Sequence, residues 1–176
     1  MKGFTLVETL VAITIIVIAV LGPFQMVQQG LLTSYAARDQ LIATALAEEG
    51  IEYVRAIRDG NYLYNLANPA TPRSWLFGVD GTGGSANCTT TNGCVVDPTG
   101  TTNVLVCGAT CPVMTVSLGS LYTQQTGSSF TATRFTRKVK LTSISSNETQ
   151  LTVTVTFNTA HTPFTVTVTD NLYNWL

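Results

Sequence analysis

Charged side chains are scarce in this sequence. Only 11% of its 176 residues are Asp, Glu, Lys or Arg, against roughly a quarter in an average soluble protein. Nine basic and ten acidic residues give a formal net charge of -1, and the chain has no run of basic residues. This pattern gives no indication of nucleic-acid binding, because phosphate recognition depends on a basic patch.

Catalytic motifs are also missing. The single histidine, His161, has no cysteine or serine motif near it, so we expect a solvated loop residue. The patterns Gly-x-Ser-x-Gly, the phosphate loop and His-Glu-x-x-His do not occur. The sequence therefore predicts a protein that is not an enzyme and that uses no cofactor.

The cysteines are few and clustered. Cys88, Cys94, Cys107 and Cys111 lie in one Thr-, Gly- and Asn-rich stretch. An even set in a chain that begins with a membrane-directing segment favours disulfides formed outside the cytoplasm. Zinc is the alternative, but the first pair has five residues between its cysteines, more than a zinc knuckle has, and no histidine lies nearby. The connectivity stays open, and the simplest pairing joins the local pairs Cys88 with Cys94 and Cys107 with Cys111.

A long apolar run is what the N-terminus does have. Residues 4–24 read FTLVETLVAITIIVIAVLGPF, and Glu8 is their only charged residue. About 20 apolar residues suffice to cross a bilayer, and Lys2 favours a cytoplasmic N-terminus. A secretory signal peptide fits poorly, because cleavage after Gly22 would precede Pro23 and because Glu8 interrupts the apolar part. A carboxylate within a span costs about 2.5 to 3.5 kcal/mol unless it is paired, so Glu8 requires a partner.

The six residues Gly3-Phe4-Thr5-Leu6-Val7-Glu8 lead directly into this run. They resemble the prepilin cleavage and methylation motif of type IV pilins and type II secretion pseudopilins. The resemblance implies that a membrane peptidase cuts between Gly3 and Phe4 and methylates Phe4. It also implies that Glu8 meets the terminal amine of a neighbouring subunit in a filament. The leader, Met1 to Gly3, is shorter than most in the family, which leaves open whether the true start lies upstream.

Helical character continues beyond the anchor. We expect a leader at 1–3, a membrane and assembly half of the helix at 4–26, and an amphipathic half at 27–59 that ends at Asp59-Gly60-Asn61. A kink or local melting is expected near 19–23, because Pro23 lacks a backbone donor. The apolar residues of the second half recur at helical spacings, and are Leu41, Ala45, Ile51, Val54 and Ile57. Its segment LAEEGIEYVRAIRD resembles the stretch after the anchor in minor pilins and minor pseudopilins.

The remainder divides in two. Residues 60–130 are predicted to be a variable, disulfide-containing loop region, in which 103–107 and 113–118 are possible short strands joined across the Cys107 to Cys111 turn. Residues 131–176 alternate apolar and polar side chains and predict three antiparallel strands. One apolar face of this sheet should cover the helix from about Leu41 to Ile57, giving an α+β fold. Trp175 is expected to close the core beside the last strand.

Function follows from the resemblance. It implies a structural subunit of a type IV pilus-like filament, a minor pilin, with a type II secretion pseudopilin as the alternative. A second alternative is a pilin-anchored adhesin that uses the Cys88 to Cys111 loops as its recognition surface. The implied partners are other pilin subunits, the prepilin peptidase and an inner-membrane assembly platform. The chain would stand in the inner membrane with its head outside the cytoplasm and then enter an extracellular or periplasmic filament.

Overall fold

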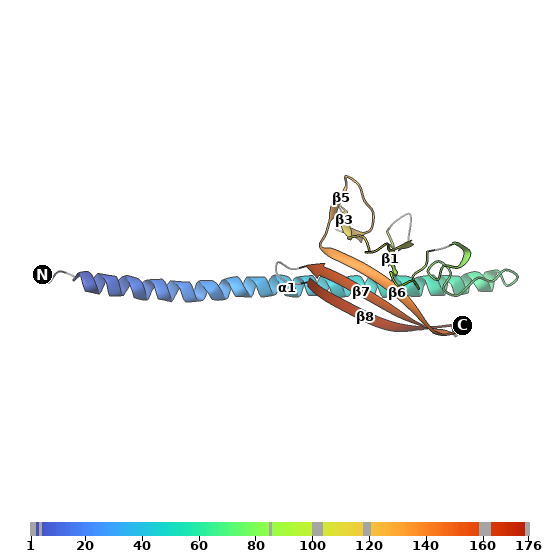
Figure 1. Cartoon of the computed structure of the whole chain (residues 1–176), viewed down its shortest axis with the longest axis horizontal. Coiled ribbons are helices and arrows are strands. Elements are labelled where there is room, and N and C mark those ends of the chain that lie inside the picture. The colour runs from blue at the N-terminus through green and yellow to red at the C-terminus, as the bar shows by residue number, and fades with distance from the viewer. Residues whose placement is uncertain are drawn as a thin grey trace. The chain divides into compact units, whose positions relative to one another are not determined.

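The structure is a computed structural model that describes residues 3, 5–84, 86–99, 104–117, 121–158 and 163–174. Its chain divides into two compact units, Met1–Gln40 and Leu41–Leu176. The helix α1, Leu6–Ala67, supplies the whole regular structure of the first unit and continues into the second (Figure 1).

Helix α1 differs from expectation at Pro23. The helix includes this residue, so the predicted local melting near 19–23 was wrong. A proline removes one backbone donor, here the partner of the Ala19 carbonyl, while the hydrogen bonds of the neighbouring turns remain. The loss of a single bond is too small to interrupt the helix, because the turns on either side keep their hydrogen bonds.

The C-terminal end of α1 also lies elsewhere. The predicted end at Asp59-Gly60-Asn61 was wrong, because the helix continues to Ala67. Asn61 is 2% exposed, and its side-chain amide donates to the carbonyls of Trp75 at 3.1 Å and Phe77 at 2.9 Å. An asparagine that resembles a helix cap in the sequence is therefore used to hold the following segment against the helix.

The second unit, Leu41–Leu176, is called the head from here on. It contains two antiparallel sheets, which confirms the predicted α+β class. The larger has the strand order β2-β1-β6-β7-β8 and the smaller has β4-β3-β5 (Figure 1). The strands are β1 Cys94–Val96, β2 Val104–Val106, β3 Thr115–Ser117, β4 Tyr122–Thr123, β5 Phe130–Ala132, β6 Phe135–Ser145, β7 Glu148–Asn158 and β8 Pro163–Tyr173, with a short 3-10 turn, η1, at Thr82–Gly84. The three long strands β6, β7 and β8 form the meander that the alternating pattern predicts.

The short strands β2 and β3 lie within the two segments proposed from the sequence, but they do not form a hairpin. β2 pairs with β1, whereas β3 pairs with β4 and β5 in the other sheet. The expectation that they join across the Cys107 to Cys111 turn was therefore wrong. Their true partners are selected by tertiary packing, which local alternation does not encode.

The core lies between α1 and the larger sheet. From the helix it includes Ala43, Leu46, Ala47, Ile51 and Val54, and from the sheet Val139, Leu141, Leu151, Val153, Val155 and Phe157. The predicted helical stripe was correct at Ile51 and Val54. It was wrong at Leu41, which is 73% exposed, and at Ala45, which is also exposed. Small residues occupy the contact face instead, so the helix backbone lies close to β7.

Candidate functional site

The motif residues Thr5 and Glu8 stand at the start of α1. The helix begins at Leu6, so Thr5 is its N-cap residue, and Thr5 Oγ1 accepts a hydrogen bond of 3.3 Å from the backbone N–H of Glu8. A threonine followed three residues later by glutamate is the capping-box pattern. The order of residues in the motif thus fixes where the helix starts, and it places Glu8 in the first turn.

The hydroxyl groups of this half of α1 are satisfied within the helix. Thr9 Oγ1 donates to the carbonyl of Leu6, and Thr14 Oγ1 donates to the carbonyl of Val11, both at 2.8 Å. A hydroxyl group that donates a hydrogen bond to its own helix backbone needs no water as a partner. These threonines are therefore compatible with hydrocarbon.

The carboxylate of Glu8 is the exception. Across the part of the chain that the structure describes, it has neither a hydrogen-bond partner for its side chain nor an ion pair. The apolar side chains around it are exposed on all faces of the helix; Ile18, for example, is 72% exposed. Helix α1 is long and apolar enough to cross a membrane, and none of its most apolar window is buried within the chain. A helix that is apolar all round requires lipid or other helices as its surroundings.

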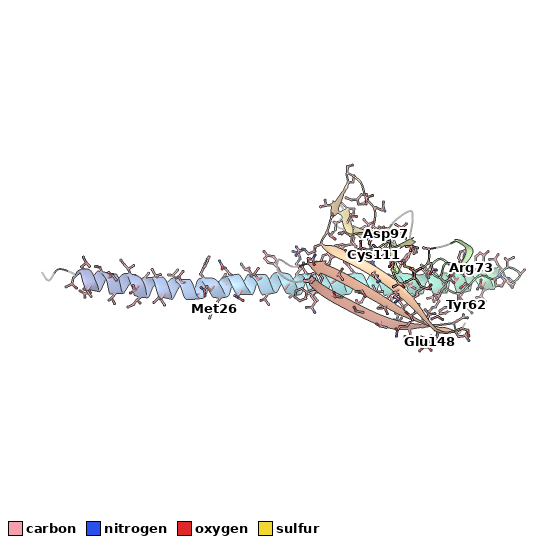
Figure 2. All side chains as sticks on the ribbon, in the orientation of Figure 1. Met26, Tyr62, Arg73, Asp97, Cys111 and Glu148 are labelled. Carbon is pink, nitrogen blue, oxygen red and sulfur yellow. A yellow bond between two sulfur atoms is a disulfide. The ribbon has the colours of Figure 1, made fainter. Side chains whose placement is uncertain are left out.

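The other predicted site residues at the N-terminus can be placed only in part. Gly3 is exposed, and nothing lies within 4 Å of where a Cβ atom would stand. Phe4, the expected methylation site, falls outside the described residues, as do His161 and Trp175. Between Met26 and Gln40 the helix stays exposed except at Ala36 and Asp39, and Figure 2 shows the side chain of Met26 projecting from it.

The four cysteines form two pairs. Cys88 is joined to Cys94 with both residues fully buried, and Cys107 is joined to Cys111 in a loop at the surface of the head. Cys111 is labelled in Figure 2. No cysteine is left free.

Comparison with known proteins finds a match at the N-terminus. A protein-family model described as "Prokaryotic N-terminal methylation motif" matches residues 1–22. The chain fits a pilin-like protein. This match and the long apolar helix fit a type IV pilin-like or pseudopilin-like protein that is anchored in a membrane before assembly. No curated protein and no solved structure matches the chain.

Sequence reasoning missed a group of residues at the other end of α1. Tyr62 and Leu66 follow the expected helix end, and with Trp75 and Tyr173 they line a pocket. One indication was available in the aromatic-rich segment NYLYNLA after Gly60, which continues the helical spacing instead of ending it.

Proposed function

We propose that this chain is a structural subunit, a minor pilin, of a type IV pilus-like filament, and that it polymerises through the N-terminal half of α1. The observation that carries the proposal is the carboxylate of Glu8, which has no partner among the described residues and lies within the methylation motif on an exposed, apolar helix. A charge in hydrocarbon is strongly stabilised by an opposite charge.

Cleavage between Gly3 and Phe4 would create such a charge, the terminal amine of the mature chain. Within one subunit the amine would stand four positions before Glu8, a rise of about 6 Å along a helix. The amine of a neighbouring subunit, offset along the filament, can approach the carboxylate instead. Pairing between subunits also covers apolar side chains on both helices as they leave the lipid.

The proposal includes the setting of the subunit. Before assembly the chain spans the inner membrane once, with the head outside the cytoplasm, and its partners are the prepilin peptidase, the assembly platform and other pilin subunits. It has no catalytic role. A type II secretion pseudopilin is the alternative, supported by the same features, and a pilin-anchored adhesin is a second. The presence of a retraction ATPase gene beside a secretin gene would favour the pilus over the secretion system.

The experiment compares Glu8→Gln with the wild type in cells that express a prepilin peptidase. Both proteins should lose Met1 to Gly3 and begin with N-methyl-Phe4, and both should insert in the membrane. Removal of one partner of a desolvated charge pair costs about 2 to 5 kcal/mol. Incorporation of the variant into sheared filaments should therefore fall by one to three orders of magnitude.

Glu48→Gln, an exposed change on the head part of α1, is the matched control and should assemble normally. Gly3→Ala should slow or stop cleavage. Equal incorporation of Glu8→Gln and wild type would reject the charge pair, and crosslinking from position 8 to neighbouring chains would then show whether the subunits are in contact at all. Retention of Met1 beside an active peptidase would reject the motif assignment.

A further inference from the structure

A pocket of about 330 Å³ lies in the head, at the end of α1. The last turns of the helix provide Arg58, Tyr62 and Leu66, the segment after the helix provides Trp75, and the end of β8 provides Tyr173 and Asn174. Figure 2 shows Tyr62 and Glu148 at the same end of the head, and Glu148 is the register partner of Tyr173.

The walls of this pocket are fixed by side-chain amides. Asn61 holds the carbonyls of Trp75 and Phe77, as described above. Asn65 makes two hydrogen bonds of 2.9 Å to the backbone of Arg73, one to its N–H and one to its carbonyl. The Arg73 guanidinium lies 4.0 Å from the centre of the Tyr64 ring. The segment that carries Trp75 is thus held against the helix before any ligand arrives, which lowers the entropic cost of binding.

The end of β8 is also fixed in position by a hydrogen bond. The N–H of Asn174 donates to the carbonyl of Asn147 at 2.9 Å, so the residue after β8 is attached to the turn between β6 and β7. The pocket therefore combines three separate segments, of which the one after α1 is held by side-chain amides and the end of β8 by a backbone hydrogen bond.

Most of the apolar residues that line the pocket lie outside the hydrophobic core. The hydrophobic core of the described residues includes Trp75 at its margin, but Tyr62, Leu66 and Tyr173 are outside it. Leu63 and Leu66 on the same turns are 64% and 61% exposed. Aromatic and aliphatic groups displayed at a surface in this way are typical of a binding site.

The chemistry of the lining selects the class of ligand. Three aromatic side chains line the pocket together with Arg58, Asn65 and Asn174, whose side chains carry hydrogen-bond donors. Arg58 is the only charged residue of the lining, and its Nε atom already donates to Asp59 at 2.8 Å. This balance does not favour a phosphate or another strong anion. A pyranose ring matches it, since the ring has apolar C–H faces and a perimeter of hydroxyl groups.

We propose that this pocket binds a hexopyranose ring, as the free sugar or as a unit of a glycan chain. The volume is at the lower end of the range for small-molecule sites, which fits one or two rings. The inference is independent of the proposed assembly function, because every lining residue belongs to the head and none to the N-terminal half of α1.

The test uses the full processed chain in a detergent without a sugar headgroup. The chain has two tryptophans, so Trp175→Phe leaves Trp75 as the only tryptophan reporter. The probes are the methyl glycosides of glucose, galactose, mannose and N-acetylglucosamine, and short oligosaccharides of each. At least one methyl glycoside should change the Trp75 fluorescence in a saturable way, with a Kd on the order of 1 mM. Tighter binding of the oligosaccharide indicates a glycan chain, and equal binding indicates the free sugar.

Three variants in the same background define the site. Tyr62→Ala should raise the Kd about tenfold, whereas Tyr62→Phe, which keeps the ring, should stay within about threefold. Leu63→Ala removes an apolar side chain from the same turn but outside the lining, and should leave the Kd unchanged. Thermal unfolding checks that each variant is folded. The absence of saturable binding to every probe, or binding that Tyr62→Ala leaves unchanged, would overturn the proposal without affecting the assembly function.

Discussion

Arg137 on β6 places its Nη1 atom 2.5 Å from Oε2 of Glu49 on α1, and the Arg137 side chain is completely buried. The same Nη1 atom donates to the carbonyl of Leu46 at 3.0 Å, and Nη2 donates to the carbonyl of Val96. One guanidinium therefore connects α1, β6 and β1. The alternating pattern of β6 places Arg137 on the inward face with Phe135 and Val139, and the structure confirms this position.

This contact gives the first prediction. Glu49→Ala leaves a buried cation without its counter-charge, a change that costs about 3 to 5 kcal/mol where both partners are buried. The Glu49 side chain is 39% exposed, so solvent reduces the effect to roughly 1 to 3 kcal/mol. Glu48→Ala, one position away and exposed, should change stability by less than about 0.5 kcal/mol. Equal denaturant midpoints for the two variants would contradict the role of the pair.

The second prediction concerns two glycines of α1. Gly60 has open space where a Cβ atom would stand, and it lies inside the helix. Gly60→Ala should therefore stabilise the head by roughly 0.5 to 1 kcal/mol. Were the helix to end at Gly60 in a left-handed cap, the same change would destabilise it. The sign of the shift in thermal midpoint thus tests where α1 ends.

Gly50 is the matched position on the buried face. A Cβ atom there would lie 3.1 Å from Cγ1 of Val153 and 3.4 Å from Cδ of Arg137. The helix-propensity gain of Gly50→Ala should be lost to this crowding, so the variant should be less stable than Gly60→Ala by about 1 kcal/mol or more. Equal stabilisation by both changes would show that α1 and β7 are not packed this closely.

The third prediction is a pH dependence centred on Asp97. This buried carboxylate accepts hydrogen bonds from Thr123 Oγ1 at 2.6 Å, from the N–H of Gln124 at 2.9 Å and from Thr99. Burial by itself raises the pKa of Asp97, but these hydrogen bonds outweigh it and hold the pKa below its ordinary value. They connect the end of β1 to β4.

A depressed pKa in the folded state means that the unfolded chain binds the proton first as the pH falls. The contribution of Asp97 is therefore complete well above about pH 4, the ordinary pKa of an aspartate, and is lost below it. Asp97→Asn should cost about 1 to 3 kcal/mol at pH 7, and the difference from wild type should shrink between pH 5 and pH 2. The pKa of Asp80 is also lowered. Because Asp80 is present in both the wild type and Asp97→Asn, its contribution cancels in the difference between their stabilities. A difference that is constant with pH would reject this account.

Glu8 belongs to a segment that local sequence patterns predict, whereas the role of Asn61 depends on residues distant in the sequence. The anchor and the long strands follow from local patterns, a run of apolar residues and a period of two, and these were predicted correctly. The end of α1 was not, because Asp59-Gly60-Asn61 has the local form of a helix stop while the amide of Asn61 is used by distant carbonyls. The face of α1 that is buried was misjudged at Leu41 for a similar reason, since close packing against β7 favours small residues over large ones.

The two candidate sites, the N-terminal motif and the pocket, also differ in how far the sequence predicts them. The N-terminal methylation motif was found because it is continuous in the sequence. The pocket at the end of α1 was missed because its lining comes from α1, from the segment after it and from β8, more than 100 positions further along the chain. Only the fold brings Tyr62 and Tyr173 to one place.

The last prediction concerns the two cysteine pairs, Cys88 with Cys94 and Cys107 with Cys111. Nonreducing peptide mapping of protein from the extracytoplasmic compartment should find these pairs and no others. The Cys88 and Cys94 residues are fully buried, whereas Cys111 is partly exposed. A mild reductant should therefore open the Cys107 to Cys111 pair first and reach the buried pair only when the head unfolds.

Each pair closes a short loop, with sequence separations of 6 and 4 residues. The chain-entropy model then gives a contribution of about 2 kcal/mol for each. Replacement of both Cys107 and Cys111 by serine should lower stability by about that amount and keep the fold. Replacement of both Cys88 and Cys94 by alanine should cost more, because it also leaves space in the core. Four free thiols, stoichiometric zinc or a crossed pairing would each contradict this arrangement, as would a buried pair that reduces before the exposed one.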